Sequence, residues 1–219
     1  MSDRTLYILR HGQTEWNVGL RMQGRRDSAL TELGRVQADL HGRTLARHGG
    51  VDRLYASPLG RTRDTAALVN AHLDVPVSYR HELVERDCGD WSGLTLQVIE
   101  TAYPDEWRAR SDDPYFHRPP AGENLEDMEA RVGDLIDALL EAPERRIALV
   151  THGVMSRVII KRLLDLEPRD AVDVRHPNEL FYRVTVGAAE QPDSAYFLEG
   201  RGPLPGLLRK NEGETILGR

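Results

Sequence analysis

Two histidines and two arginines of this chain occur close to the ends of short apolar segments. Arg10 and His11 follow the apolar run 6–9, and His152 follows the run Ile-Ala-Leu-Val-Thr at 147–151. Arg61 comes shortly after a third such segment, 51–56. A histidine can act as a nucleophile and form a covalent intermediate, and the planar fork of an arginine binds phosphate oxygens. These residues together indicate phosphoryl transfer through a histidine.

Each residue also has a structural interpretation. A histidine after a strand is often only hydrogen-bonded, and a single arginine on a helix is usually a surface charge. The tripeptide Arg47-His48-Gly49 repeats Arg10-His11-Gly12, but it ends an amphipathic pattern. A cation followed by glycine is typical of a helix C-terminus. We therefore interpret the second copy as a cap. Four further histidines have no comparable context: His41, His72, His81 and His176.

Phosphoryl transfer also needs a proton donor for the leaving oxygen. The segment 82–93 is rich in carboxylates and offers Glu82, Glu85 and Asp87. Partial burial and a neighbouring phosphate dianion would both raise the pKa of a glutamate enough for it to donate a proton. The chemistry alone does not choose among the three.

The composition limits the class of protein. The 219 residues are enough for one large domain with a substantial core, and the net charge of −6 argues against a nucleic-acid partner. A single cysteine, Cys88, excludes an internal disulfide. No signal peptide is evident and no apolar run approaches the ~20 residues of a membrane span, so we expect a cytoplasmic protein. No residue cluster has metal-ligand spacing, and we expect neither metal nor cofactor.

Strand-like and helix-like segments alternate along the chain. Thr31 begins a helical pattern with Leu33, Val36 and Leu40 on one face, and it ends near 48–50. Ser57 and Pro58 resemble an N-cap and first turn of a helix that runs to about residue 71. Further expected elements are strands at 76–79, 146–151, 181–186 and 195–198 and helices at 123–139 and 154–164.

This alternation predicts an α/β fold, a three-layer sandwich with a mostly parallel central sheet and helices on both faces. We expect residues 1–219 to form a single domain, with 86–122 as a short cap insertion and 200–219 as an irregular tail. Ligands of such sheets bind beyond the carboxyl ends of the strands, where a helix N-terminus can add N–H groups for an anion. The histidines and arginines can therefore converge at that edge.

The motifs closely resemble the histidine phosphatase superfamily, in the branch of cofactor-dependent phosphoglycerate mutases and related small-molecule phosphatases. The resemblance runs from Leu6 to about Ile160. The motifs are Arg10-His11-Gly12-Gln13-Thr14-Glu15-Trp16-Asn17, 22–34 with Gln23-Gly24, Ser57-Pro58-Leu59-Gly60-Arg61, Glu85 before Gly89-Asp90-Trp91, Gly122-Glu123-Asn124 and Thr151-His152-Gly153.

The resemblance implies a role for each motif residue. His11 would be the nucleophile that carries the phosphoryl group, and Glu85 would be the proton donor. Because His11 must attack as a neutral imidazole, we expect a backbone carbonyl to hold its other nitrogen. Residues implied around the phosphoryl group are Arg10, Arg61 and His152, with Asn17, Gln23, Gly24 and Gly153 at the edge of the pocket.

The resemblance implies a metal-independent phosphatase of a small phosphorylated metabolite, resembling acid-type histidine phosphatases. Ser92 replaces the glutamate of many relatives, and the segment between the acid and the second histidine is shorter than in the mutases. Alternatives are a phosphoglycerate mutase, a protein-directed phosphatase or a non-catalytic phosphate-binding module. A homodimer is compatible with the sequence. Cap residues that could contact substrate are Trp107, Arg108, Arg110, Tyr115, Phe116, His117 and Arg118.

Overall fold

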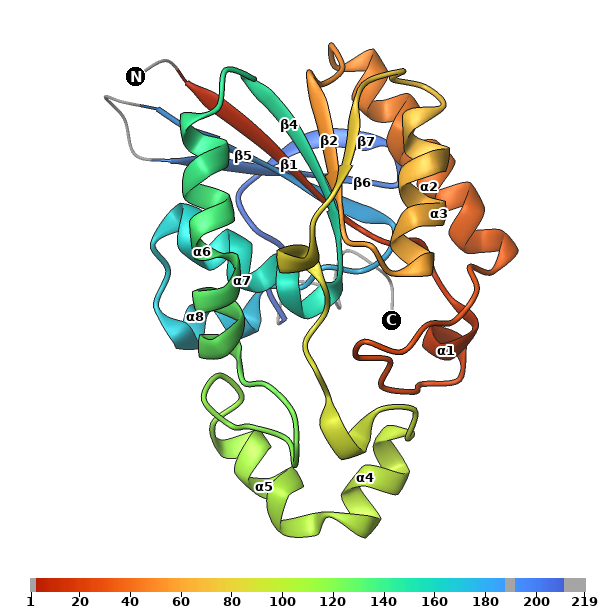
Figure 1. Cartoon of the computed structure of the whole chain (residues 1–219), viewed down its shortest axis with the longest axis vertical. Coiled ribbons are helices and arrows are strands. Elements are labelled where there is room, and N and C mark those ends of the chain that lie inside the picture. Colours follow the sequence, from red (N-terminus) through yellow and green to blue (C-terminus); the bar gives the residue numbers. More distant parts are fainter. Residues whose placement is uncertain (1–2, 188–191, 211–219) are drawn as a thin grey trace.

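A computed structural model describes residues 3–187 and 192–210 and shows a seven-stranded sheet between two layers of helices (Figure 1). The strands are β1 Arg4–Arg10, β2 Arg53–Ala56, β3 Val77–Tyr79, β4 Arg146–Thr151, β5 Leu180–Val186, β6 Asp193–Leu198 and β7 Arg201–Pro205, in the order β3-β2-β4-β1-β5-β6-β7. Strands β3, β2, β4 and β1 are mutually parallel, as predicted. Strand β5 pairs with β1 in the antiparallel direction. Strands β6 and β7 then follow by antiparallel pairing, because their short connections allow hairpins but not parallel crossovers.

Helices cover both faces of the sheet, which confirms the predicted α/β sandwich. The helices are α1 Glu15–Val18, α2 Glu32–Arg47, α3 Gly60–Asn70, α4 Leu96–Ala102, α5 Pro104–Asp112, α6 Leu125–Glu141, α7 Gly153–Leu164 and α8 Pro168–Asp173. Short 3-10 helices add His81–Leu83 and Gly89–Trp91.

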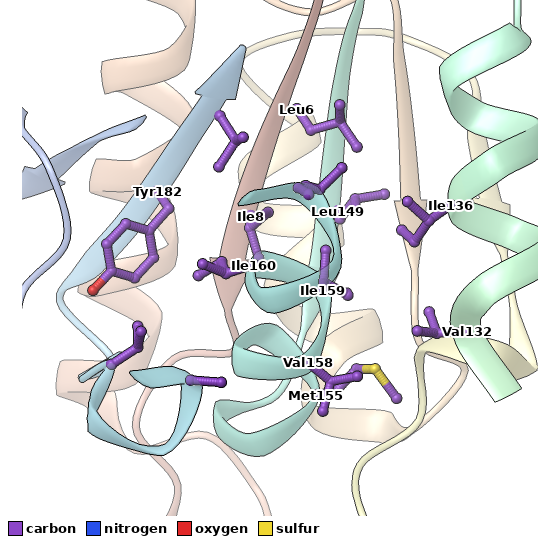
Figure 2. Packing of buried hydrophobic residues seen from close by; sticks show 14 of the residues in the cluster. Leu6, Ile8, Val132, Ile136, Leu149, Met155, Val158, Ile159, Ile160 and Tyr182 are labelled. Carbon is purple, nitrogen blue, oxygen red and sulfur yellow. The ribbon is translucent and has the colours of Figure 1, made fainter. Parts of the chain in front are cut away.

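Successive residues of the central strands face opposite layers. Leu6 and Ile8 of β1 pack with α6 and α7 in the larger core, which Figure 2 shows, whereas Tyr7 and Leu9 pack toward α2 and α3. This alternation follows from the two-residue period of a strand. Because both faces of the sheet are buried, the sequences of the central strands are continuous apolar runs.

Helix α2 does not bury the face that its apolar pattern predicts. Leu33 and Val36 are 52% and 55% exposed. The buried face instead includes Gly34, Ala38 and Gly42. A Cβ built on Gly34 would lie 2.0 Å from the carbonyl oxygen of Gln13, so this helix packs against the segment after His11 at backbone contact. Close approach therefore selects the small-residue face over the apolar one.

Two local expectations need correction. The helix after β2 starts at Gly60, and its N-cap Leu59 makes no side-chain cap, so Ser57 is free for another contact. The segment 86–122 contains α4 and α5, which lie at the far end of the molecule in Figure 1. The start of the tail, 201–205, is the edge strand β7, whereas residues 211–219 lie outside the described residues. The helix stop at Arg47 and His48 is confirmed.

Candidate active site

The carboxyl ends of β2, β4 and β1 lie side by side and bring the predicted residues together. The His11 N–H donates to the Thr151 carbonyl at 3.0 Å, and the Ser57 N–H donates to the Val150 carbonyl at 3.0 Å. The rings of His11 and His152 meet edge to face with centroids 5.3 Å apart. The predicted convergence of the strand ends is thus confirmed by the register of the sheet.

His11 is buried and held as a neutral imidazole. Its Nδ1 lies 2.8 Å from the Gly12 carbonyl oxygen, as predicted. Because a carbonyl only accepts, Nδ1 carries the hydrogen and the lone pair remains on Nε2. Burial lowers the pKa of His11 well below its ordinary value, and the nearby charges of Arg61 and Arg10 lower it further. The ring therefore presents an unprotonated nitrogen.

Arg61 is 2% exposed, and the loop that follows α1 holds its side chain in place. Its guanidinium donates to the carbonyls of Gly24 at 2.8 Å and Arg26 at 2.7 Å and pairs with Asp27 at 3.1 Å. Nε remains buried without a partner. Burial lowers the pKa of Arg61, opposed by the charges of Glu85 and Asp27.

The N-terminus of α3 is not open to an anion, contrary to expectation. Asp27 accepts the N–H groups of Gly60 and of Arg61, the latter at 3.2 Å. This carboxylate occupies the place that the helix offers to phosphate. Side chains must therefore provide most of the positive charge of the site.

Arg10 lies between His11 and the first turn of α7. One of its terminal nitrogens donates to the His176 carbonyl at 2.8 Å, and its Nε is buried without a partner. Burial lowers the pKa of Arg10 to about 10. A Cβ on Gly153 would lie 3.3 Å from the Arg10 guanidinium carbon, tighter than ordinary van der Waals contact. Glycine at this position makes room for the arginine.

His152 is fully buried, and its orientation comes from Ser57. The two side chains meet at 2.9 Å between Nε2 and Oγ, while Nδ1 of His152 has no partner. Burial lowers the pKa of His152 well below its ordinary value, with Arg61 as the next cause. The sequence offered no signal for this contact, because Ser57 resembled a helix cap.

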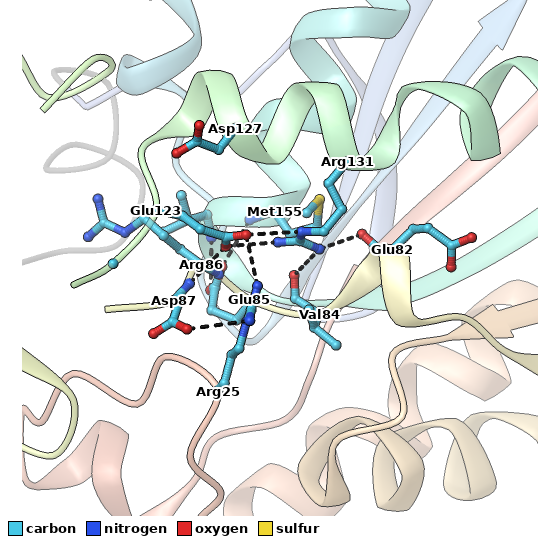
Figure 3. A network of polar contacts seen from close by, with 12 residues as sticks. Arg25, Glu82, Val84, Glu85, Arg86, Asp87, Glu123, Asp127, Arg131 and Met155 are labelled. Carbon is cyan, nitrogen blue, oxygen red and sulfur yellow. Dashed lines mark hydrogen bonds and ion pairs between the residues drawn. The ribbon is translucent and has the colours of Figure 1, made fainter. Parts of the chain in front are cut away.

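Geometry separates the three candidate acids. Glu85 accepts N–H groups of Arg86 at 2.9 Å and of Val154 and Met155 at 3.1 Å each, at the start of α7 (Figure 3). Glu82 is paired with Arg80 at 2.7 Å and Asp87 with Arg25 at 3.4 Å. The charge of Glu85 raises the pKa of both Arg10 and Arg61, so Glu85 is the candidate acid that adjoins these two arginines.

The residues expected at the edge of the pocket are anchored by α1 and the loop after it. Asn17 closes a capping box with Thr14, whose N–H donates to Asn17 Oδ1 at 3.1 Å. Gln23 donates to Thr14 Oγ1 at 2.8 Å and keeps a buried Oε1 without a partner. Gly24 orients Arg61 through its carbonyl. Their contacts with substrate stay predictions.

Several cap residues that the sequence offered for substrate contact make structural contacts instead. Arg118 pairs with Asp127, and the Tyr115 hydroxyl donates to Glu129 at 2.5 Å. Arg108 and Phe116 are exposed. In contrast, His117 stacks on Trp91 with centroids 5.7 Å apart, and Arg110 lies over the Trp107 ring at 4.8 Å.

Two residues that hold the backbone around His11 in place were not identified from the sequence. Asn178 donates to the His11 carbonyl at 2.7 Å, and its own carbonyl meets His41 Nε2 at 3.0 Å. Thr65 accepts the Gly12 N–H at 3.1 Å. They were missed because they are distant in the sequence: Asn178 lies 167 residues from His11. No sequence pattern links residues so far apart.

Within the described ranges no three His, Cys, Asp or Glu side chains gather in a way that could hold a metal ion. Among the helices of the described residues, none is long and apolar enough to cross a bilayer.

Comparison with known proteins identifies the class. A model of the histidine phosphatase superfamily (branch 1) matches residues 6–191, and the chain belongs to this superfamily. It is 35% identical over 175 residues to glucosyl-3-phosphoglycerate phosphatase of Mycobacterium tuberculosis (strain CDC 1551 / Oshkosh), covering 76% of this chain and 78% of that protein.

Mutases are similar to the same degree. The 2,3-bisphosphoglycerate-dependent phosphoglycerate mutase of Nitrobacter winogradskyi is 37% identical over 181 residues, covering 77% of this chain and 84% of that protein. Among solved structures, mycobacterial glucosyl-3-phosphoglycerate phosphatase in complex with VO3 has a TM-score of 0.76 at 30% identity, covering 86% and 99% of the two chains. The family is therefore one of phosphatases and mutases.

Proposed function

We propose that this protein hydrolyses a small phosphate monoester through a phosphohistidine on His11, without a metal ion. The supporting observation is a neutral His11 with a free Nε2, surrounded by Arg10, Arg61 and His152, each with a buried nitrogen that lacks a partner. Such unpaired donors are costly unless a ligand satisfies them. A phosphoryl group fits because its oxygens accept several N–H bonds.

The first step transfers the phosphoryl group to the protein. The lone pair on His11 Nε2 forms a bond to phosphorus as the ester P–O bond breaks. Glu85 gives its proton to the leaving oxygen, so the alcohol departs neutral. Arg10, Arg61 and His152 stabilise the charge that spreads over the three phosphoryl oxygens.

The second step returns the protein to its starting state. Glu85, now a carboxylate, takes a proton from water as the water oxygen attacks phosphorus. The P–N bond breaks and its electron pair returns to Nε2, giving neutral His11 and inorganic phosphate. Asn17, Gln23, Gly24 and Gly153 complete the edge of the phosphate pocket in this proposal.

The finer assignments also belong to this proposal. The reaction is of the acid-type histidine phosphatase class, in the cytoplasm, with residues 1–219 acting as one domain and 86–122 as its cap. A homodimer is compatible with the reaction but is not required by it, since all the catalytic groups come from one chain.

Phosphoglycerate mutase activity is the second candidate, because mutases are as similar in sequence as phosphatases. A mutase must protect its phosphohistidine from water and return the phosphoryl group to another hydroxyl. The short cap favours access of water and hence hydrolysis.

A hydrolysis panel with EDTA present, run on wild type and His11→Ala, tests the proposal. Wild type should release phosphate from at least one of 3-phosphoglycerate, phosphoserine, sugar phosphates and nucleotides, and His11→Ala should not. Full activity of His11→Ala would refute the nucleophile. Isomerisation of 3-phosphoglycerate, primed by a bisphosphate and faster than hydrolysis, would establish the mutase instead.

A further inference from the structure

A pocket beside α2, here called the α2 pocket, lies outside the proposed phosphate site. Its volume of about 570 Å³ is within the range of small-molecule sites. Its walls come from α2, from the segment 175–179 before β5 and from Glu199 after β6. None of the residues assigned to the phosphate pocket lines it. The proposed reaction therefore gives this pocket no role.

Part of the α2 pocket is the apolar face of α2 that the sheet leaves exposed. Leu33 and Val36 are 52% and 55% exposed, and Leu40 follows them on the same face. Apolar side chains grouped at a concave site mark a binding surface, whereas single exposed ones do not. An apolar group placed there would remove their surface from water.

The remaining wall carries charges of both signs. Glu179 and Glu199 adjoin, since the Glu199 N–H donates to the Glu179 carbonyl at 3.0 Å, and Arg175 lines the same pocket. Among the ion pairs formed within residues 3–187 and 192–210, none involves these three side chains. Two carboxylates and a guanidinium complement a ligand that has both an ammonium group and a carboxylate.

His41 adds an acceptor without a donor to the wall of the α2 pocket. It is 1% exposed, and its Nε2 lies 3.0 Å from the Asn178 backbone carbonyl. Because a carbonyl only accepts, Nε2 carries the hydrogen and Nδ1 keeps its lone pair. Nδ1 is buried without a partner, which is unfavourable unless an occupant supplies an N–H donor.

The same wall holds the backbone on both sides of the proposed nucleophile. Asn178, which contacts His41, donates to the His11 carbonyl at 2.7 Å. Gln37, one turn before His41 on α2, accepts the Gln13 N–H at 2.9 Å. An occupant that contacts Gln37 and His41 therefore restrains the segment that carries His11.

We propose that the α2 pocket binds an α-amino acid with an apolar side chain and that its occupancy raises the rate of the reaction at His11. The ammonium group lies at Glu179 and Glu199, the carboxylate at Arg175 and the side chain on the apolar face of α2. The effect on rate, unlike the binding itself, rests on the proposed function. It arises because a more firmly held nucleophile is better aligned for attack.

An NMR titration of the wild-type protein with L-leucine tests the binding. Isopentylamine and 4-methylpentanoate are the comparison compounds, because they lack the carboxylate and the amine respectively. Leucine should bind at least fivefold more tightly than either. Glu199→Gln should weaken leucine binding at least fivefold.

Glu141→Gln is the matched control, since Glu141 is an exposed glutamate at the end of α6 and does not line the α2 pocket. It should bind leucine as the wild type does. Equal affinity for the three compounds, or undiminished binding of leucine by Glu199→Gln, would overturn the site.

Hydrolysis of p-nitrophenyl phosphate tests the coupling. Saturating leucine should raise kcat of the wild type at least twofold, and the same concentration should have no such effect on Glu199→Gln. A kcat that leucine leaves unchanged or lowers would overturn the coupling. Protein that binds leucine but hydrolyses no phosphate ester would refute the proposed function and leave the binding site intact.

A second copy of the chain is the other occupant that the apolar face of α2 would accommodate. Analytical ultracentrifugation of wild type and Val36→Asp separates the two cases. We expect the same mass for both proteins. A dimer that dissociates in Val36→Asp would assign this face to a partner subunit and overturn the amino-acid site.

Discussion

At the scale of single residues, the candidate site keeps two histidines neutral among arginines. His11 and His152 are deeply buried and lie close to fixed positive charge, so both resist protonation. The Gly12 carbonyl holds Nδ1 of His11, so Nε2 is the nitrogen that would attack in the proposed reaction. Ser57 holds the His152 ring in its orientation through its hydroxyl, which contacts Nε2 and takes no direct part in the proposed reaction.

Ser57→Ala should therefore lower kcat without unfolding the protein. Losing the bond to Nε2 frees the His152 ring to turn, and misplacement of a catalytic group costs on the order of tenfold to a hundredfold in rate. KM should change less. Steady-state kinetics with circular dichroism as a check on folding would measure this.

Ser156→Ala is the matched control, because it removes another buried serine hydroxyl, one that donates to the Gly153 carbonyl at 3.0 Å. Ser156→Ala should retain activity within about threefold. A hydrogen bond from a side-chain hydroxyl to a backbone carbonyl contributes about 1 kcal/mol or less to stability, and this one holds no proposed catalytic group. Equal activity of Ser57→Ala and wild type would disprove the positioning role of Ser57.

At the scale of elements, three parallel strands bring the proposed catalytic residues to one edge of the sheet, and this convergence could be predicted from the sequence. Their apolar runs and the polar residues that follow are local signals. The packing of α2 was not predictable in the same way. Its exposed Leu33 and Val36 make the apolar pattern misleading, because contact with the backbone at Gln13 decides which face is buried.

Gly34→Ala tests that packing. Its Cβ would overlap the Gln13 carbonyl, so either α2 or the segment after His11 must move. We expect a loss of stability of about 1–3 kcal/mol, typical of overpacking, together with a fall in kcat. Urea unfolding and kinetics would measure both.

Gly19→Ala is the comparison, because a Cβ there meets its nearest atom at 3.5 Å, an ordinary contact. It should leave both quantities nearly unchanged. If Gly34→Ala were as stable and active as wild type, the close contact between α2 and the segment after His11 would not be needed for stability or activity.

At the scale of the whole molecule, the two-faced sheet and the cap provide a buried and positively charged site within an acidic protein. The family, the fold and the position of each motif could be predicted from local patterns. Long-range contacts could not, because nothing near Asn178 or Thr65 in the sequence reveals a bond to the His11 segment.

Burial of neutral histidines should make the stability of the whole protein sensitive to acid. Burial lowers the pKa of His11, His152 and His176 well below the ordinary value of 6.5 and that of His41 to about 4. Below pH 6.5 the unfolded chain therefore binds protons that the native state does not. The stability that depends on these histidines being neutral is therefore present above pH 6.5 and is lost as the pH falls below it.

Each such histidine increases the slope of the unfolding free energy against pH by at most about 1.4 kcal/mol per pH unit. Urea unfolding between pH 7 and 5 should show the decline, and His41→Gln should reduce its slope by up to one histidine's share. A free energy of unfolding that stays constant over this range would contradict the burial of neutral rings.

Trapping the phosphorylated protein intermediate is the direct test that His11 carries the phosphoryl group. Wild-type protein would be mixed with a substrate labelled in its phosphate, quenched within milliseconds and mapped by peptide mass spectrometry. We expect an acid-labile, base-stable phosphoryl group on His11 that is absent from His11→Ala. Label on a serine, or on another histidine in the wild-type protein, would contradict it.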